Sequence, residues 1–282
     1  MYQAGLVLEG GGMRGLFTAG VLDYFIDLGM EFQEVYGVSA GICNACSYLS
    51  KQRGRSLRVN TNYLEDPRYC SVESLIKTGD LFGADMLYRI IPDELDPYDY
   101  ETFQKYPGKA YAVVMNCETG KAEYMRLRRM DKDIQAVRAS SSMPMVSRMV
   151  EIEGQLYLDG GISDSIPVIQ SMRNGNEKNV VVLTRDATYR KTPSRGMAAF
   201  RLRYKKYPNL IKQMEYRHVR YNKTLEFIEK GRKMGKIFVI QPKKPIEIGR
   251  VEKDKEKLRE LYEEGYESAR DSYEGLMEFL KR

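Results

Sequence analysis

The sequence predicts an α/β protein of three layers, in which helices cover both faces of a mainly parallel sheet, followed by a helical C-terminal extension. Three observations predict this class. Short apolar runs rich in Val, Ile and Tyr alternate with helical patterns. The chain begins strand, helix, strand, helix, an order that requires right-handed crossovers between parallel strands. The last hundred residues are mostly helical and strongly charged.

The individual elements follow from periodicity. Strands are expected at 5–10, 35–39, 110–116, 122–127, 148–158, 180–184 and 236–240. Helices are expected at 16–28, 40–51, 132–141 and 163–173, and two further amphipathic helices at 208–231 and 251–280. The segment "DATYRKTPSR" at 186–195 marks a boundary. We therefore expect a catalytic core at 1–185, with its motifs within about 5–172, and a basic helical extension at 186–282 packed on that core.

The bulk composition is that of a globular protein. In 282 residues, 43% hydrophobic, no apolar run is long enough to cross a bilayer as a helix. The N-terminus enters a strand directly, without a secretory pattern, so a cytoplasmic location is expected. The cysteines do not form a disulfide framework, and Cys43 and Cys46 make a C-x-x-C without a second ligand pair. Reduced thiols and no metal site are therefore predicted.

Charge is unevenly distributed along the chain. The segment 190–244 holds 17 Lys and Arg residues and three acidic residues, so its net charge is +14. Because the whole chain has a net charge of +6, the residues outside this segment have a net charge of −8. Such a segment attracts anionic lipid head groups or nucleic acid, although a solvated basic helical face has the same composition. We expect peripheral contact with an anionic membrane through these residues, and no nucleic acid.

A glycine-rich loop follows the first expected strand, in "LVLEGGGMRG" at 6–15. Gly10, Gly12 and Gly15 match G-x-G-x-x-G, a pattern that holds a dinucleotide pyrophosphate at a helix N-terminus. The same amides also suit the oxyanion that forms when a carbonyl is attacked. The loop alone leaves both ligands open.

The second expected strand ends in Gly37-Val-Ser-Ala-Gly41, a G-x-S-x-G. This pattern places a serine on a sharp strand-to-helix turn, where glycines on either side allow close approach of the neighbouring chain. A dinucleotide fold would instead place an acidic residue at the end of this strand to bind the ribose. Because that position is Ser39, the pair of motifs favours a nucleophile beside an oxyanion site.

A nucleophilic serine needs a proton acceptor, and two residues are candidates. Asp159, in Leu158-Asp-Gly-Gly-Ile162, follows a strand-like run, and two glycines leave its carboxylate projecting from a tight turn. A buried carboxylate with a raised pKa takes such a proton directly. His218 is the one histidine, and the order Ser39, Asp159, His218 is that of the α/β-hydrolases. We favour Asp159, because His218 lies on the apolar stripe of a basic helix.

These motifs, in this order and at their strand ends, resemble the patatin-like phospholipase family, particularly its bacterial members, over about three-fifths of the chain. The runs "ASSSMP" at 139–144 and "DGGISDSIP" at 159–167 also look like family blocks. The resemblance implies a serine–aspartate dyad without histidine, with Ser39 as nucleophile and Asp159 as base. It implies an oxyanion hole at Gly10, Gly11, Gly12 and Met13, with Arg14 in the family's basic position, and motif support from Gly15, Gly37, Gly41, Gly160 and Gly161. No cofactor is required.

The sequence therefore predicts a serine acyl hydrolase that cleaves carboxylic esters, most plausibly of lipids, through an acyl-enzyme. Three alternatives stay open. One is an esterase that uses a Ser39–His218–Asp159 triad, and another is a nucleotide-binding protein that uses the glycine loop for phosphate. The third is a non-catalytic membrane-binding or nucleic-acid-binding module that uses the basic segment.

Overall fold

Eight strands form one sheet in the computed structural model, which describes residues 1–281. The strands are β1 Tyr2–Leu8, β2 Phe32–Val38, β3 Lys109–Asn116, β4 Ala122–Leu127, β5 Val150–Ile152, β6 Gln155–Asp159, β7 Asn179–Val182 and β8 Ile237–Ile240. Their order is β5-β6-β3-β2-β1-β7-β8, with β4 paired to β3. The pairs β3–β2–β1–β7–β8 are parallel, whereas β4, β6 and β5 pair antiparallel.

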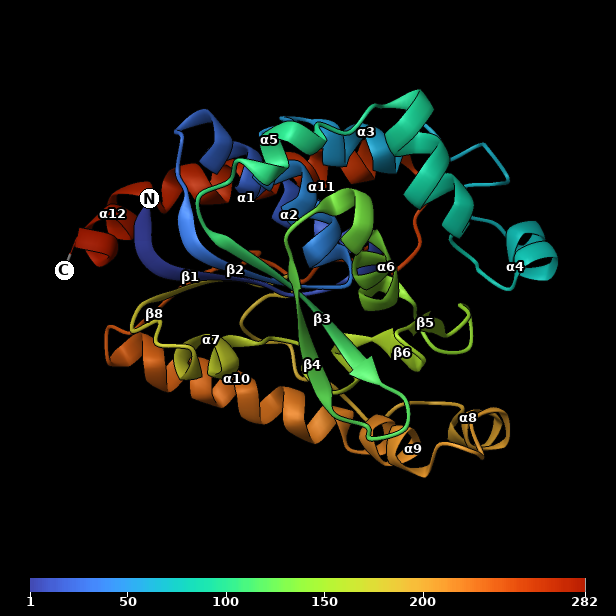
Figure 1. Ribbon diagram of the computed structural model, residues 1–282. Helices are drawn as coiled ribbons and strands as arrows, with labels where there is room; N and C mark the ends of the chain where they lie inside the picture. The colour runs from blue at the N-terminus through green and yellow to red at the C-terminus, as the bar shows by residue number, and fades with distance from the viewer. Residues whose placement is uncertain (282) are drawn as a thin grey trace.

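Helices cover both faces of this sheet (Figure 1), which confirms the predicted fold class. One face carries α1 Leu16–Asp27, α2 Ala40–Leu49 and α11 Lys255–Asp271, and the other carries α7 Val168–Arg173 and α10 Arg217–Lys233. The remaining helices are α3 Arg55–Thr61, α4 Val72–Thr78, α5 Tyr100–Gln104, α6 Met130–Ser141, α8 Met197–Arg203, α9 Pro208–Glu215 and α12 Tyr273–Lys281. Two 3₁₀ turns, η1 Gly12–Gly15 and η3 Gly160–Ile162, and a π-helix, η2 Met86–Leu95, complete the described elements.

The central strands are buried on both faces. Along β1, Leu6 and Leu8 belong to the apolar cluster that includes α1, α2 and α11, while Val7 belongs to the cluster that includes Tyr221 and Ile228 of α10. Successive strand residues point to opposite faces, so a run without polar alternation is what a doubly covered parallel strand requires. This burial fixes the strand ends, from which the functional motifs project.

The chain after residue 186 adds to the same sheet. Strand β8 pairs in parallel with β7, and α11 packs along α1. The two helices touch backbone to backbone, because a β-carbon at Gly20 would overlap the carbonyl oxygen of Tyr262, and one at Gly265 would overlap that of Phe17. The extension thus contributes a strand and a closely fitted helix to the core.

The structure differs from the sequence prediction at several boundaries. The expected strand at 148–158 is a hairpin, β5 and β6, because Glu153 and Gly154 both adopt positive φ and turn the chain. The expected helix at 208–231 is broken at Tyr216 into α9 and α10, and the helix at 251–280 is broken at Ser272. Helix α7 begins only after Pro167, so the expected helix at 163–173 is shorter.

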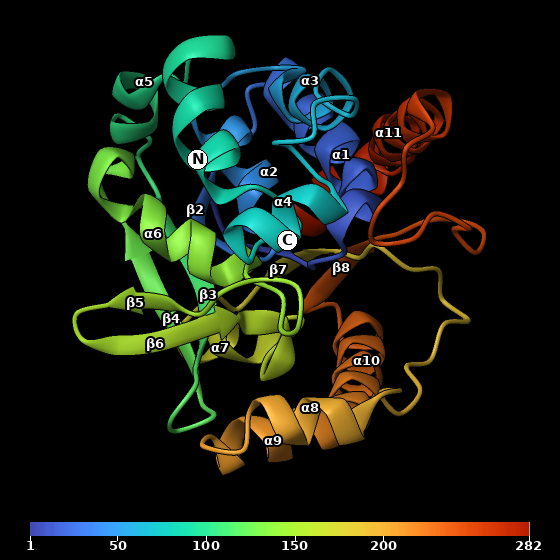
Figure 2. The same ribbon diagram turned by 90° about the vertical axis from the view of Figure 1, so that its right-hand side faces the viewer.

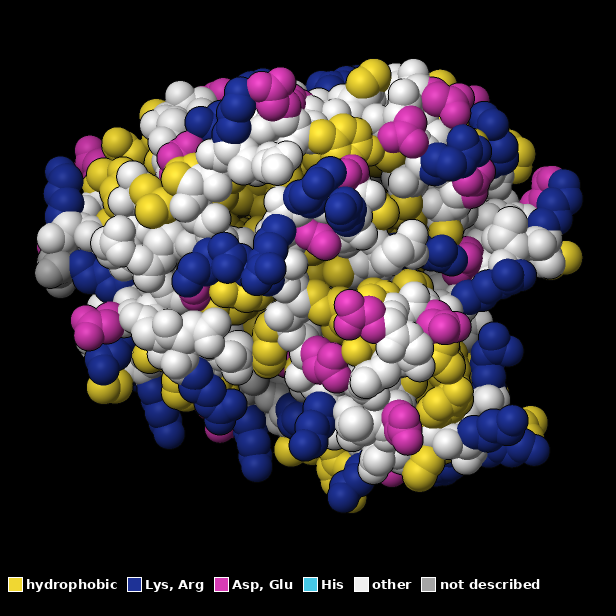
Figure 3. Space-filling model, in the orientation of Figure 1, with side chains coloured by type: hydrophobic (Ala, Val, Ile, Leu, Met, Phe, Trp, Pro, Cys, Tyr) yellow, Lys and Arg dark blue, Asp and Glu magenta, His cyan; other side chains and the backbone are white. Residues whose placement is uncertain are grey.

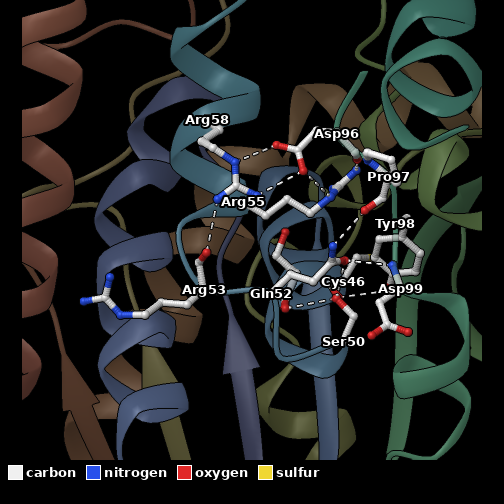
Figure 4. A network of polar contacts seen from close by, with 11 residues as sticks. Cys46, Ser50, Gln52, Arg53, Arg55, Arg58, Asp96, Pro97, Tyr98 and Asp99 are labelled. Atoms are coloured by element: carbon white, nitrogen blue, oxygen red, sulfur yellow. Dashed lines mark hydrogen bonds and ion pairs between the residues drawn. The ribbon is translucent and has the colours of Figure 1, made fainter. Parts of the chain in front are cut away.

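A helical cap between α2 and β3 was not predicted, and it carries α3, α4, η2 and α5 (Figure 2). Pro92 lies inside η2, where its missing N–H prevents regular α-helical bonding. A polar network fastens the end of η2 to α2 and α3 (Figure 4). Asp96 forms ion pairs with Arg55 and Arg58, and the Tyr98 hydroxyl donates to the Cys46 carbonyl at 2.9 Å. The cap thereby holds the helix that follows Ser39.

Candidate active site

The two predicted catalytic turns converge on one edge of β3. Val38, the last residue of β2, is opposite Val113, and Asp159, the last residue of β6, is opposite Val114. Strand β4 occupies the other edge of β3 over the same residues. Strand β2 runs parallel to β3 and β6 runs antiparallel, so their C-terminal ends face each other along this edge. The sheet register therefore brings Ser39 and Asp159 together across 120 residues of sequence.

Ser39 occupies a strained turn between β2 and α2. Its φ is 54° and its ψ is −126°, a conformation that non-glycine residues rarely adopt and that active sites retain. The flanking glycines make the turn possible: a β-carbon at Gly37 would lie 2.5 Å from the Ile42 Cα, and one at Gly41 would lie 2.5 Å from the Leu8 carbonyl oxygen. The serine, although only 8% exposed, lies at the N-terminus of α2, where the helix dipole favours negative charge.

The end of α6 fixes both turns. The Ser39 amide donates to the Ser140 hydroxyl at 2.9 Å, and the Asp159 amide donates to the Ser142 carbonyl at 2.9 Å. Each bond uses a backbone group of the turn and leaves the side chain free to act. This explains why the serine-rich segment at 139–144 accompanies the other two motifs in the sequence.

The glycine loop lies against Ser39. A β-carbon at Gly10 would lie 2.8 Å from the Ser39 Cβ, so glycine is required where the two turns meet. Gly12 has a φ of +60°, and a β-carbon there would lie 2.5 Å from the Arg250 carbonyl oxygen. The segment before α11 therefore covers the outside of the loop.

The amides of this loop differ in their partners. The Met13 amide donates to the Arg250 carbonyl at 3.1 Å. No hydrogen bond of the Gly10, Gly11 or Gly12 amide is found within residues 1–281. These glycine amides are therefore available to an anion, whereas the Met13 amide is engaged within the chain.

Asp159 is 7% exposed and its carboxylate is held by its own turn. Oδ1 accepts from the Gly161 amide at 2.7 Å. Burial raises the pKa of Asp159, while the Arg217 guanidinium and a hydrogen bond from the Ser39 hydroxyl act in the opposite direction. Arg217, at the start of α10, also donates from Nε to the Gly161 carbonyl at 2.5 Å.

A cavity of about 500 Å³ joins these groups. Ser39, Asp159 and the glycines at 10–12 line it together with Leu81, Met143, Met197, Phe200 and Met214 on its apolar part. Its polar part is lined by Glu9 and by six basic residues, which are Arg14, Arg185, Lys191, Arg195, Arg217 and Arg250. The cavity thus combines apolar and basic lining residues with Ser39 and Asp159.

Two predicted candidates lie elsewhere. His218 does not line the cavity, and its Nδ1 is buried without a hydrogen-bond partner in the described chain. Cys43 and Cys46 are free thiols in α2, and burial raises the pKa of both. No cluster of metal-ligating side chains was found among residues 1–281.

The sequence analysis missed three residues that line the cavity, Glu9, Lys191 and Arg217. The signal for Glu9 was its position beside the glycine loop, and the signal for Lys191 and Arg217 was their place in the basic segment.

Comparison with known proteins identifies the family of the chain. The family model described as "Patatin-like phospholipase" matches residues 6–172, which is more than half of the chain. The chain belongs to this family. The resemblance seen in the sequence is therefore confirmed, and family membership implies a hydrolase acting on lipid esters. A second family model, described as "Domain of unknown function (DUF6363)", matches residues 207–281, the part that contains Arg217 and Arg250.

Two proteins resemble the chain over most of its length. "Uncharacterized protein YjjU" of Escherichia coli strain K12 is 31% identical over 246 residues, which are 86% of this chain and 69% of that protein. VipD from Legionella pneumophila shares the fold with a TM-score of 0.51 at 13% identity, over 99% of this chain and 66% of the VipD chain. Within residues 1–281, no helix is both long and apolar enough to span a membrane.

Proposed function

We propose that this protein is a serine acyl hydrolase that cleaves a carboxylic ester of a lipid with a Ser39–Asp159 dyad. One observation carries the proposal: Ser39, Asp159 and the glycine loop line a single cavity at the end of the sheet. The serine has the strained backbone of a nucleophile turn, and the acid is buried beside it. The apolar part of the cavity suits an acyl chain.

The chemistry follows from these positions. Ser39 Oγ attacks the acyl carbonyl and its proton passes to Asp159, giving a tetrahedral oxyanion. The ester C–O bond breaks, and the alcohol leaves with the proton from Asp159. Water then gives a proton to Asp159 and attacks the acyl-enzyme. Release of the carboxylic acid returns the proton from Asp159 to Ser39.

The amides of Gly11 and Gly12 are the donors that we assign to the oxyanion. Both lack partners within the described residues, whereas the Met13 amide is engaged by Arg250. Preorganised amides in a water-poor site stabilise developing charge strongly. Arg14, which lies in the loop, lines the cavity and is 9% exposed, adds positive charge to the site.

The other candidates have less support. A triad would need His218 beside Ser39, but this histidine is absent from the cavity lining. A dinucleotide site would need an acid at the end of β2, where Ser39 stands instead. The basic segment alone gives no reason for a strained serine beside a buried carboxylate.

A fluorophosphonate probe tests the nucleophile. We expect the wild-type protein to be labelled and Ser39→Ala to remain unlabelled, because only an activated serine is phosphonylated. Ser47 is a matched control, since it is a buried serine on the same helix, and Ser47→Ala is expected to label as the wild type does. Mass spectrometry of the labelled peptide identifies the site. An unlabelled but folded wild-type protein would contradict the proposal.

The pH dependence of hydrolysis tests the base. Burial raises the pKa of Asp159 above the ordinary value of 3.8, and the base must be ionised to act. With a neutral ester, we expect kcat/KM to fall on acidification with a midpoint above 3.8. Arg217 lowers this pKa, so Arg217→Gln is expected to move the midpoint to higher pH. A midpoint that does not respond to Arg217 would argue against Asp159 as the base.

We further propose peripheral contact of a cytoplasmic protein with an anionic membrane. Lys and Arg side chains gather over α8, α9 and α10 at the lower edge of Figure 3. Val72 and Ile76 of α4 and Leu202 of α8 are exposed apolar residues. Both helices lie toward the viewer in Figure 2. Basic charge with exposed apolar side chains is the combination that binds a lipid surface.

A further inference from the structure

We propose, building on the hydrolase function above, that the cavity selects lipid esters whose alcohol carries a phosphate monoester, and that Lys191, Arg217 and Arg250 bind this head group. The proposal concerns the basic part of the cavity lining, where the side chains of Lys191 and Arg250 have no part in the acyl-transfer chemistry above. It names a substrate class narrower than lipid esters in general. A zwitterionic head group is the alternative that the structure disfavours.

The first argument is an excess of unpaired positive charge. Six basic residues line the cavity, and none of them forms an ion pair with a carboxylate anywhere in residues 1–281. Basic residues elsewhere in the chain commonly do, as Arg201 does with Glu215. Cations that converge without counter-ions on a cavity indicate an anionic ligand.

The two acids of the cavity do not neutralise this charge. Glu9 is 5% exposed, and its carboxylate accepts from the Thr184 amide at 2.7 Å and from the Tyr221 hydroxyl at 2.6 Å. Asp159 serves as the proposed base. Five arginines and Lys191 face two carboxylates, so the surplus is three positive charges when Lys191 is neutral and four when it is protonated. A dianionic phosphate reduces this surplus more than a monoanionic phosphodiester does.

Two basic residues of the cavity have a lowered pKa, as expected where positive charges lie close together without a counter-ion. Burial and the neighbouring Arg217 lower the pKa of Lys191 to about 7, although Glu9 opposes them. Burial and the neighbouring Arg185 lower the pKa of Arg14 to about 10, and its Nε is buried without a hydrogen-bond partner in the described chain. A bound phosphate would stabilise the charged form of both side chains.

The aromatic side chains of the cavity argue against a choline head group. Quaternary ammonium groups are bound by open aromatic faces. Here the Lys191 ammonium lies 4.4 Å from the Tyr221 ring centroid, and the Arg185 guanidinium lies 4.6 Å from that of Tyr189. The two tyrosine rings on the basic part of the lining are therefore already covered by cations, and a further cation there would meet like charge.

The test compares three substrates with the same acyl chain in neutral detergent micelles: a lysophosphatidic acid, a lysophosphatidylcholine and a monoacylglycerol. We expect kcat/KM of the wild-type protein to be at least ~10-fold higher for the phosphate monoester than for either other substrate, because hydrogen bonds to charged groups are strong and specific. Soluble glycerol 3-phosphate is expected to inhibit hydrolysis of a neutral ester competitively, and glycerol is not.

Variants test which residues cause the preference for the phosphate head group. Lys191→Met and, separately, Arg250→Gln are expected to lower the phosphate-to-neutral ratio of kcat/KM by ~10-fold each. Arg250 is exposed and Lys191 is half-buried, so the Arg250 variant tests the head-group site even if position 191 tolerates no change. Lys230→Met is the matched control, because Lys230 is an exposed lysine of the same basic segment that does not line the cavity. Its ratio is expected to stay within twofold of the wild type.

The results of these experiments distinguish a failure of the head-group inference from a failure of the hydrolase function on which it rests. Equal hydrolysis of the three substrates by an enzyme that the fluorophosphonate labels would overturn the head-group inference and keep the hydrolase. A ratio that falls as much in Lys230→Met as in Lys191→Met would also overturn it, because general surface charge would then explain the preference. Absence of both hydrolysis and labelling would refute the hydrolase itself, and the inference with it.

Discussion

Asp159→Asn is expected to lower kcat by ~10²–10⁴-fold, the range that a general base contributes. Asparagine keeps the size of the side chain and an oxygen that accepts from the Gly161 amide, but it cannot take the Ser39 proton. The loss therefore belongs to the chemical step. Hydrolysis of a short neutral ester measures it, since such a substrate makes few contacts away from the reacting carbonyl.

The matched control is His218→Ala, whose kcat is expected to stay within about twofold of the wild type because His218 does not line the cavity. Thermal unfolding of both variants checks that the fold is intact. If His218→Ala lost activity and Asp159→Asn kept it, the dyad would be wrong, and Ser39 would have to use His218 without Asp159 after movement of α10. Loss in both variants would favour the Ser39–His218–Asp159 triad over the dyad.

The fold class was predictable because the burial of both sheet faces leaves a strong pattern. Residues 4–8 of β1 and 180–182 of β7 carry no polar side chain, and the glycine-flanked turns after β1 and β2 stand where strand ends are expected. The hairpin at Glu153 was missed because its turn sits inside one continuous strand-like run. The cap was missed because its helices are short and its π-helix contains Pro92, which gives no regular period.

The sequence predicted only those residues of the candidate site that lie in short sequence motifs. Ser39, Asp159 and the glycine loop each carry a turn motif. Arg217 and Lys191 do not, because they reach the cavity through the packing of α10 and the preceding loop. Their basic segment contains many similar side chains, and composition does not show which of them face inward. The engagement of the Met13 amide likewise depends on Arg250, a residue more than 200 positions away.

Gly265→Ala is expected to lower the free energy of unfolding by about 2–3 kcal/mol, the effect of overpacking a closely fitted interface. In an exposed helix the same change would be favourable by about 1 kcal/mol, because alanine has the higher helix propensity. Here the added methyl group would overlap the Phe17 carbonyl oxygen, and that atom belongs to the backbone of α1. The helices α1 and α11 must then separate along their contact. Urea unfolding monitored by circular dichroism measures the change.

Gly275→Ala provides the opposite expectation in the neighbouring helix α12. A β-carbon there would approach the Phe238 ring no closer than 3.6 Å, an ordinary contact, so the propensity gain of about 0.5–1 kcal/mol should appear as added stability. Opposite signs for one chemical change at two helical glycines would show that α11 is part of the core that supports the glycine loop. Equal, small effects would instead mean that α11 packs loosely on α1.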